Sequence, residues 1–263
     1  MFKLTSLNLN GIRSASSKGL HDWLAAEQPD CICVQELKAQ VPDLLGRFEH
    51  IAGLHGYFHC AEKKGYSGVG IYTRHPPSDV RQGFGPPEFD AEGRYLELRF
   101  DTPTRRLSLI SAYFPSGSSG PERQEAKFRF LAAMRPHLQQ LRAEREFILC
   151  GDINIAHQEK DLKNWRGNQK NSGFLPHERA WLDTRYDVDG WIDAFREVNQ
   201  EEDQYTWWSN RGQAWAKNVG WRIDYQMVTP DLRGKALAAS IWKDSRFSDH
   251  APLIMDYAID LPG

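Results

Sequence analysis

Residues 147–154 read Phe-Ile-Leu-Cys-Gly-Asp-Ile-Asn, a short apolar run that stops at a glycine and then presents a carboxylate and a carboxamide. Four consecutive apolar residues bounded by a turn signal are typical of a buried β-strand. The pattern therefore predicts a strand that delivers Asp152 and Asn154 to its open end.

Polar side chains end or precede several other predicted strands in the same way. Carboxylates and carboxamides offer oxygen atoms, while Tyr and His offer acid–base groups. Core strands rarely end on so many of these groups, so their presence at sheet edges favours a metal-assisted hydrolase. These residues are Asn8, Asn10, Glu36, Tyr113, Asp224, Asp249 and His250.

The composition is that of an ordinary globular chain. Its 263 residues include 33 Lys and Arg against 35 Asp and Glu, so any affinity for nucleic acid must come from a local patch. No linker divides the chain, and we expect one domain over residues 1–263. No apolar stretch is long enough to cross a membrane and no export signal precedes the first strand pattern, so we expect a cytoplasmic protein with no membrane partner.

Short apolar or alternating segments recur along the whole chain and predict strands. They cover residues 2–9, 30–35, 68–73, 95–100, 107–113, 147–150, 223–228 and 253–258. Helices are predicted at 19–27, 122–145 and 177–186, the last two preceded by Pro121 and Pro176. This mixture favours layered α/β architecture over an all-β sandwich.

Four residues offer the oxygen ligands that a hard cation such as Mg²⁺ prefers, if the strand ends converge. They are Glu36, Asn10, Asp152 and Asp249. Each one alone is better explained by a turn or a cap, where Asp and Asn are common. The set of four is better explained by a metal site, and oxygen-rich sites take Mn²⁺ as well as Mg²⁺.

His250 stands at the entrance of the last predicted strand, where it could donate to or position a phosphoryl oxygen. Such a histidine needs a carboxylate to fix its tautomer, and Asp224 is the natural candidate. The alternative is a surface histidine, which fits most of the other histidines better. No His-Glu-x-x-His or comparable spacing occurs, which excludes a zinc protease.

Residues 205–225 interleave four tryptophans with basic side chains. This combination stacks on bases or sugars while it neutralises phosphates, although an aromatic core is the alternative. We assign Trp208 to the core and Trp207 and Trp221 to a ligand wall, and leave Trp215 open. The polar, amide-rich segment 160–171 either follows a phosphate backbone or is a solvated loop.

Six segments together resemble the exonuclease III family of apurinic/apyrimidinic (AP) endonucleases, within the endonuclease/exonuclease/phosphatase fold. The resemblance covers essentially the whole chain, and a chance match to all six in order is not credible. The segments are 8–13 (NLNGIR), 34–38 (VQELK), 151–157 (GDINIAH), 167–174 (GNQKNSGF), 218–225 (NVGWRIDY) and 248–252 (SDHAP).

The resemblance implies a four-layer α/β sandwich, in which two mixed β-sheets pack face to face with helices outside. It also implies a monomer that cleaves double-stranded DNA 5′ to an abasic site and leaves a 3′-hydroxyl and a 5′-deoxyribose phosphate. Activities at 3′ ends, as an exonuclease, a phosphatase or a phosphodiesterase, use the same centre and stay open.

The resemblance further implies roles for the metal and water site. Glu36 would be the principal Mg²⁺ ligand, with Asn10 and Asp249 nearby, directly or through water. Asp152 would orient or deprotonate the attacking water and, like Asn154, lie at the metal; Asn154 would hold that aspartate and a phosphate oxygen. Some relatives carry Asp where this chain has Asn10, which weakens a second metal position there.

Other carried-over roles concern the substrate. His250, paired with Asp224, would contact the scissile phosphate, and Tyr113 and Asn8 would complete its cradle. Whether Asp152 or His250 is the general base stays open. The remaining residues would hold the phosphate near the abasic nucleotide or line the pocket for its base-less sugar, and they are Asn168, Asn171, Trp207, Trp221 and Ile223.

Enzymes of the same fold that act on other phosphates would share this catalytic set: phosphatidylinositol-phosphate phosphatases, sphingomyelinases and unspecific DNases. The loop 168–174 and the segment around Trp221 favour abasic DNA over these substrates. A DNA-binding protein without catalysis would not need the complete acid, amide and histidine set. Loops 116–120 and 209–214 either press into the DNA grooves or are surface turns.

Overall fold

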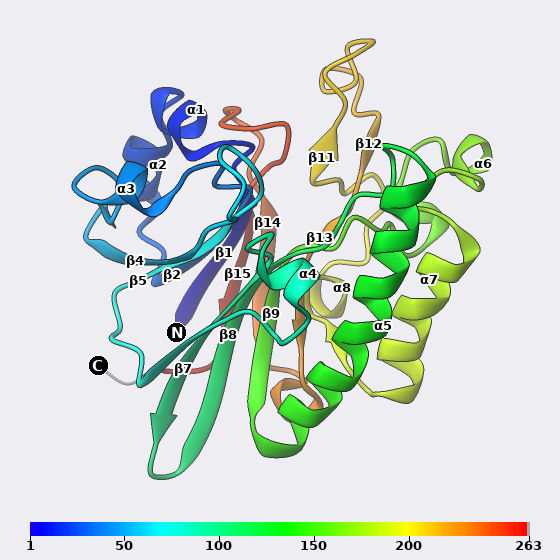
Figure 1. The fold of residues 1–263 in the computed structure, drawn as a ribbon. Coiled ribbons are helices and arrows are strands. Elements are labelled where there is room, and N and C mark those ends of the chain that lie inside the picture. The colour runs from blue at the N-terminus through cyan, green and yellow to red at the C-terminus, as the bar shows by residue number, and fades with distance from the viewer. Residues whose placement is uncertain (262–263) are drawn as a thin grey trace.

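The computed structural model describes residues 1–261 and contains two large β-sheets packed face to face (Figure 1). The first has the strand order β14 (Ala236–Ile241), β15 (Leu253–Tyr257), β1 (Phe2–Asn8), β2 (Cys31–Gln35), β5 (Val69–Thr73), β4 (Leu54–His59) and β3 (His50–Ile51). The second has the order β10 (Ile192–Asp193), β13 (Asp224–Val228), β9 (Glu146–Asp152), β8 (Arg105–Tyr113), β7 (Tyr95–Thr102) and β6 (Asp79–Gln82).

Both sheets are mixed. Strand β1 is parallel to β2, and β8 is parallel to β9, while the other neighbours in the two sheets are antiparallel. A separate two-stranded hairpin pairs β11 (Trp207–Trp208) with β12 (Gly220–Trp221). It rises above the second sheet at the edge where β13 begins (Figure 1).

Helices cover the outer faces of both sheets, with α1 to α3 against the first and α5 and α7 against the second (Figure 1). Their bounds are α1 (Ile12–Ser17), α2 (Leu20–Glu27), α3 (Val41–Leu44), α4 (Pro87–Asp90), α5 (Pro121–Glu144), α6 (Trp165–Asn168), α7 (Pro176–Asp183) and α8 (Ala194–Val198). Two 3₁₀ turns lie at Glu159–Asp161 and Pro230–Leu232, and a π-helical turn at Thr184–Val188 follows α7.

Three apolar clusters separate the four layers. Residues of both sheets, such as Leu4 and Leu109, form the central cluster. Leu24 of α2 packs with the outer face of the first sheet, and Phe130 and Met134 of α5 pack with that of the second. The spacing of the buried α5 residues follows the helical repeat, so one stripe of this helix faces the sheet. The predicted four-layer α/β sandwich is confirmed.

The eight predicted strand segments are confirmed with small shifts at their ends. The sequence prediction missed the short or edge strands β3, β6, β10, β11, β12 and β14, and also the six-residue internal strand β4. Strand β6, for example, is largely exposed and therefore lacks the apolar run on which the prediction depends. Across residues 1–261, none of the helices combines the length and apolarity that crossing a bilayer requires.

Candidate active site

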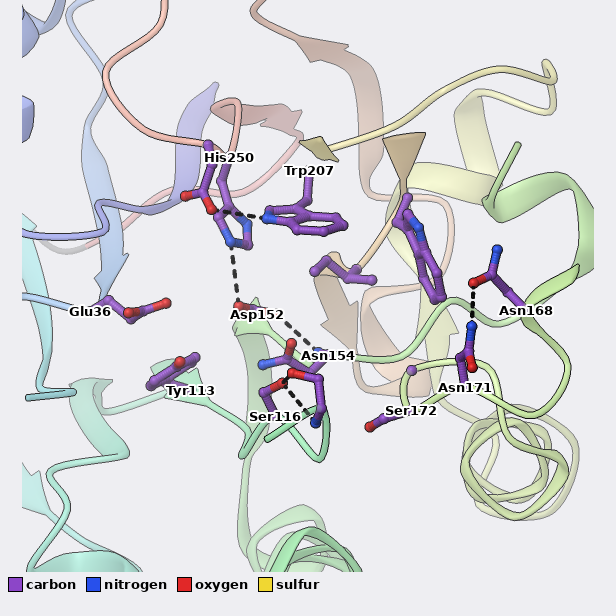
Figure 2. A pocket seen from close by; sticks show the side chains of 15 residues that line it. Glu36, Tyr113, Ser116, Asp152, Asn154, Asn168, Asn171, Ser172, Trp207 and His250 are labelled. Atoms are coloured by element: carbon purple, nitrogen blue, oxygen red, sulfur yellow. Dashed lines mark hydrogen bonds and ion pairs between the residues drawn. The ribbon is translucent and has the colours of Figure 1, made fainter. Parts of the chain in front are cut away.

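A cavity of about 490 Å³ opens where strand ends of the two sheets meet (Figure 2). Most of the predicted site residues line it, namely Glu36, Tyr113, Asp152, Asn154, Asn168, Asn171, Trp207, Trp221, Ile223, Asp249 and His250. Asn8 and Asp224 are buried behind its wall, and Asn10 lies in a neighbouring hollow that shares Asp249 with it. The cavity thus joins strand residues with residues of several connecting loops.

Strand register brings the acidic groups of the second sheet together. Asp152 at the end of β9 is paired with Tyr113 of β8 on one side and with Asp224 of β13 on the other. Asn8 of the first sheet crosses to this row, because its Nδ2 donates to Asp152 Oδ2 at 3.0 Å and to Glu36 Oε1 at 2.9 Å. Asn8 is fully buried and does not line the cavity, and its two hydrogen bonds join the acids of the two sheets, while its place in the phosphate cradle stays a prediction.

The central strands of the two sheets end in the same local turn. The backbone N–H of Asn10 donates to Asn8 Oδ1, and that of Asn154 donates to Asp152 Oδ1, each at 2.9 Å. Asn10 and Asn154 both have positive φ, which asparagine tolerates better than most residues. The backbone of Asn154 therefore holds Asp152, while its side-chain Nδ2 donates to the carbonyl of Phe114 at 2.8 Å.

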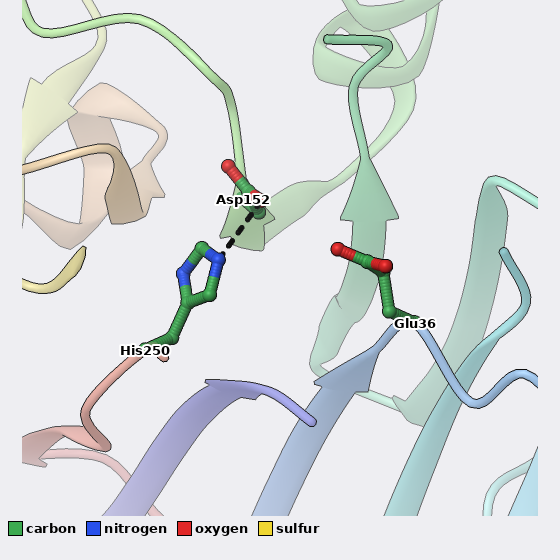
Figure 3. A group of neighbouring side chains, drawn as sticks. All are labelled: Glu36, Asp152 and His250. Carbon is green, nitrogen blue, oxygen red and sulfur yellow. Dashed lines mark ion pairs between the residues drawn. The ribbon is translucent and has the colours of Figure 1, made fainter. Parts of the chain in front are cut away.

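His250 lies between the carboxylates of Asp224 and Asp152, and Figure 3 shows its ion pair with Asp152. Its Nδ1 lies 2.8 Å from Asp224 Oδ2, and its Nε2 lies 3.7 Å from Asp152 Oδ2. Burial alone favours the neutral ring, but Asp224 and Asp152 outweigh it and raise the pKa of His250 to about 10. The ring is therefore a proton donor at neutral pH, with Nδ1 committed to Asp224 and Nε2 directed toward Asp152.

The surroundings of Asp152 have opposing effects on its pKa. Burial raises its pKa to about 8, and the carboxylates of Asp224 and Glu36 act in the same sense, while His250 and the Asn8 hydrogen bond oppose them. A cation held beside Glu36 would favour the ionised form further. A carboxylate with a raised pKa is a stronger base than an exposed one, which suits proton abstraction from water.

On the Glu36 side of the cavity, the side-chain oxygens of Glu36 and Asn10 surround the Lys38 ammonium. Lys38 Nζ lies 3.0 Å from Glu36 Oε2 and donates to Asn10 Oδ1 at 2.5 Å, and Asn10 Nδ2 donates to Asp249 Oδ1 at 3.1 Å. Ligand atoms of Glu36, Asp152 and His250 all lie within 4.8 Å of one another. The Glu36 and Asp152 carboxylates fit a divalent cation, which prefers oxygen ligands, while the protonated His250 ring acts as a hydrogen-bond donor beside them.

Tyr113 supplies a protonated phenol at the cavity wall. Burial raises its pKa well above the usual value, and the nearby Glu36 carboxylate adds to this effect. The guanidinium of Arg94, a buried residue that the sequence analysis did not single out, lies 4.8 Å from the centre of the Tyr113 ring. The phenol therefore stays available as a hydrogen-bond donor throughout the neutral range.

The opposite wall is apolar. Trp207 and Trp221 are directly paired across the β11–β12 hairpin, with ring centroids 6.5 Å apart and planes at 77°. Trp207 Nε1 donates to Asp249 Oδ2 at 3.0 Å, which fixes the ring beside the acidic end of the cavity. Gly173 has φ +93°, and a Cβ at this position would lie 3.1 Å from Trp221, so a glycine is needed for this close packing.

The other two tryptophans lie outside the cavity wall. Trp208 is buried in a small cluster, which agrees with its assignment to the core. Trp215, left open by the sequence, packs edge-on against Trp208 at 4.5 Å between ring centroids. Arg246 stacks on the same Trp215 ring at 4.4 Å.

A polar loop closes the far end of the cavity. Asn171 Nδ2 donates to Asn168 Oδ1 at 2.8 Å, so the two predicted amides act as one unit (Figure 2). The sequence analysis did not assign roles to Ser116, Ser118 and Ser172, whose side chains also line the cavity. Serine is too common in turns for its type to reveal a site, and only its neighbours in space do so.

Comparisons with known proteins agree with this geometry. The model of the Endonuclease/Exonuclease/phosphatase family matches residues 5–250. The chain is 38% identical to the Exodeoxyribonuclease of Bacillus subtilis (strain 168), over 95% of this chain and 97% of that protein. It is 36% identical to the DNA repair nuclease APEX1 of Danio rerio, over 98% of this chain and 82% of that protein.

The fold is also shared with a solved structure of an AP endonuclease from Archaeoglobus fulgidus. The TM-score is 0.86 at 25% identity, and the match covers 98% of this chain and 100% of that one. The chain therefore belongs to the endonuclease/exonuclease/phosphatase family and, within it, to the phosphodiesterases of the exonuclease III and class II AP endonuclease type.

Proposed function

We propose that this protein is a DNA repair enzyme that hydrolyses the phosphodiester 5′ to an abasic site in double-stranded DNA. The observation that carries this proposal is a single cavity with two different ends. One end holds the Asp152, His250 and Glu36 centre, and the other is walled by two opposed tryptophans and Ile223. A hydrolytic centre beside an apolar recess suits a phosphate attached to a bare deoxyribose.

The reaction needs a nucleophilic water, stabilisation of charge on the phosphoryl oxygens, and release of the 3′ oxygen. Asp152 accepts a proton from the water molecule while the water oxygen attacks phosphorus. His250 donates from Nε2, and Tyr113 from its hydroxyl, to the phosphoryl oxygens. The P–O3′ bond then breaks, and the 3′ oxygen takes up a proton to leave a 3′-hydroxyl and a 5′-deoxyribose phosphate.

The charges around His250 support Asp152 as the general base in this proposal. The imidazole lies between two carboxylates that raise its pKa to about 10, which favours the imidazolium as a proton donor. Asp152, whose own pKa is raised to about 8, is held ionised by this imidazolium and by a cation beside Glu36. A divalent cation bound at Glu36, with Asn10 and Asp249 close by, would neutralise charge on the phosphate and on the leaving oxygen. We propose Mg²⁺ for this position, and Mn²⁺ suits the same oxygen ligands.

Selectivity for damage follows from extrusion of the nucleotide. A nucleotide without a base loses little stacking energy when it rotates out of the duplex. The Trp207, Trp221 and Ile223 wall offers apolar contact to its sugar, and the Asn168–Asn171 pair offers amide groups for a flanking phosphate. An intact nucleotide would have to place its base in the same recess.

Basic side chains flank the cavity on both sides and supply the local patch that DNA binding needs. One adjoining hollow shares Tyr113 with the cavity and is lined by Lys63 and Arg123, and Glu92 lies beside Arg123 at 3.3 Å. The hollow on the other side shares Asp249 and is lined by Lys18 and Arg246. A strand whose scissile phosphate sits at Asp152 could therefore meet cations in both directions.

Glu36→Ala is expected to raise the Mg²⁺ requirement at least about tenfold, because the substitution removes the principal carboxylate of the metal site. The measurement is the incision rate as a function of Mg²⁺ concentration. Glu88→Ala is the control, since Glu88 is an exposed acid paired with Arg129 on the outer helices. An unchanged Mg²⁺ midpoint in Glu36→Ala would remove this residue from the metal site.

A 3′-end-processing enzyme with weak AP endonuclease activity is the second candidate. The observation that favours it is the 38% identity to a protein named Exodeoxyribonuclease, together with a catalytic centre that suits both reactions. A phospholipid phosphatase of the same fold would share the centre too, but it has no use for the paired tryptophans.

The deciding experiment uses end-labelled duplex DNA with one tetrahydrofuran abasic analogue, incubated with the protein and Mg²⁺ or EDTA. We expect metal-dependent incision immediately 5′ to the analogue. Release of phosphate or nucleotides from a 3′ end without incision would favour the second candidate. No reaction at any DNA end would redirect the assignment to phospholipid phosphates.

A further inference from the structure

Two charged side chains lie fully buried behind the cavity and take no direct part in the chemistry described above. Lys127 comes from α5 and Glu178 from α7, and Lys127 Nζ lies 2.7 Å from Glu178 Oε1 with neither side chain exposed. Neither residue lines the cavity. A buried ion pair is a weak source of stability, since apolar side chains of similar size often stabilise as well or better.

Lys127 holds the end of the catalytic strand. Besides the ion pair, its Nζ donates to the carbonyl oxygen of Asn154 at 2.7 Å. Asn154 is the residue whose backbone N–H binds Asp152 and whose φ is +56°. The ammonium therefore fixes the peptide that follows an unusual backbone conformation, one residue beyond the turn that orients the proposed base.

Glu178 holds the loop that carries the substrate amides. Its Oε2 accepts from the backbone N–H groups of Gly173 at 2.7 Å and of Leu175 at 3.0 Å. Its Oε1 accepts from Ser172 Oγ at 3.4 Å and from Gln124 Nε2 at 3.0 Å. The carboxylate thus anchors the chain directly after Asn171 and holds Gly173 in place against Trp221.

The loop around Ser116, which lines a third wall of the cavity, packs on side chains that bind the Glu178 carboxylate. A Cβ on Gly117 would lie 2.0 Å from Gln124 Oε1 and 2.6 Å from Ser172 Oγ, so the loop around Ser116 packs directly on these two side chains. Both of them donate to Glu178. Three segments that are distant in sequence therefore meet at one buried carboxylate.

We propose that the Lys127–Glu178 ion pair is a positioning element that sets the distance between the catalytic strand end and the substrate loop of the cavity. Lys127 fixes the Asp152 side through the Asn154 carbonyl, and Glu178 fixes the Asn171 side through the Gly173 amide. The ion pair links both cavity walls to α5 and α7. Removal of either charge should therefore shift both the Asn154 turn and the Asn171 loop. This inference rests on the proposed function for its kinetic readout only.

The test compares Glu178→Gln with a matched control. Glutamine keeps the size and one acceptor oxygen but leaves Lys127 without a counter-charge. Asp101→Asn does the same to the buried Arg145 guanidinium, which Asp101 binds with both oxygens. Asp101 is paired with Arg106 of β8, about 23 Å along that strand from Tyr113 at 3.3 Å per residue, so the control lies far from the cavity.

Two readouts separate positioning from stability. In Glu178→Gln we expect faster amide hydrogen exchange in segments 153–157 and 171–175 and a loss in kcat/KM for the abasic duplex of roughly 10- to 100-fold. In Asp101→Asn we expect the exchange rates of these segments and kcat/KM to match those of the wild-type protein. The melting temperature should fall in both variants. The double variant Lys127→Met/Glu178→Leu removes both charges together with the hydrogen bonds to Asn154, Gly173 and Leu175, so its kcat/KM should stay low.

Several outcomes would overturn the proposal. One is unchanged exchange in both segments of Glu178→Gln, and another is an equal loss of kcat/KM in Asp101→Asn. Full recovery of activity in the double variant would show that the pair contributes only stability. If the wild-type protein does not incise the duplex, the proposed function fails, and the exchange comparison alone decides whether the pair sets these segments.

Discussion

Asp152→Asn is expected to abolish incision of abasic DNA, with turnover reduced about 10³-fold or more, while the fold and DNA binding persist. The amide is isosteric, so it can still accept the N–H of Asn154 and keep the turn at the end of β9. It cannot accept a proton from water, and its Nδ2 would face the Nδ2 of Asn8 in place of an acceptor. Single-turnover cleavage and duplex binding, measured on the same preparation, separate the two effects.

His250→Asn should have a similar effect, because it removes the imidazolium that Asp224 and Asp152 hold in the cavity wall. His157→Asn is a matched control, since His157 pairs with Asp183 at 2.7 Å outside the cavity. The control should cleave at the wild-type rate. Unfolding of Asp152→Asn or His250→Asn, detected by circular dichroism, would mean that these residues are structural caps and not catalytic groups.

Asp161→Asn is expected to lower the free energy of unfolding by about 3–5 kcal/mol, because it leaves Arg196 without a carboxylate partner and the buried Arg222 with Asp193 alone. Asp161 Oδ1 accepts from Arg222 Nε at 2.8 Å and from Arg196 Nη2 at 2.7 Å, and Asp161 and Arg222 are fully buried. Urea unfolding of the variant measures the loss. Asp203→Asn is the control, since its pair with Lys163 is exposed and contributes less than about 1 kcal/mol.

The same carboxylate predicts an acid-labile contribution to stability. Burial alone would raise the pKa of Asp161, but Arg222 and Arg196 outweigh it and hold the pKa well below the usual range. A carboxyl group with a depressed folded-state pKa stabilises the protein above its unfolded pKa of about 3.9. This stabilisation is lost as the pH falls below about 4 toward the folded pKa, so the difference between wild type and Asp161→Asn should shrink there.

The Asp161, Arg196 and Arg222 ion cluster lies next to the cavity in the chain, so its loss should also affect activity. Arg222 lies between Trp221 and Ile223 of the sugar wall, and its backbone N–H donates to the carbonyl of Asp161 at 2.7 Å. Asp224, the partner of His250, follows two residues later. A partial loss of this cluster should therefore disturb the pocket before the rest of the protein unfolds.

The sequence alone determined the strands at the centre of the two sheets and the residue types at their ends. Runs such as Phe147–Cys150 are apolar because both faces of a central strand are covered, and this pattern is local enough to read directly. The resemblance to a known family added the two-sheet arrangement and the residues that line the cavity. Edge strands such as β6 and the two-residue strands of the β11–β12 hairpin carry no such pattern and were missed.

Only the tertiary structure decided which polar groups face the substrate and which hold others in place. Asn8 and Asp152 are 144 residues apart in the chain, yet Asn8 is buried and hydrogen-bonded to Asp152, a contact that the sequence does not reveal. Lys127, Glu178 and Asp161 sit in segments that read as ordinary helix or turn, and their burial follows only from what packs over them. Residue type reveals which chemistry is available, but desolvation and hydrogen-bond partners are set by neighbours distant in the chain, and these determine each group's role.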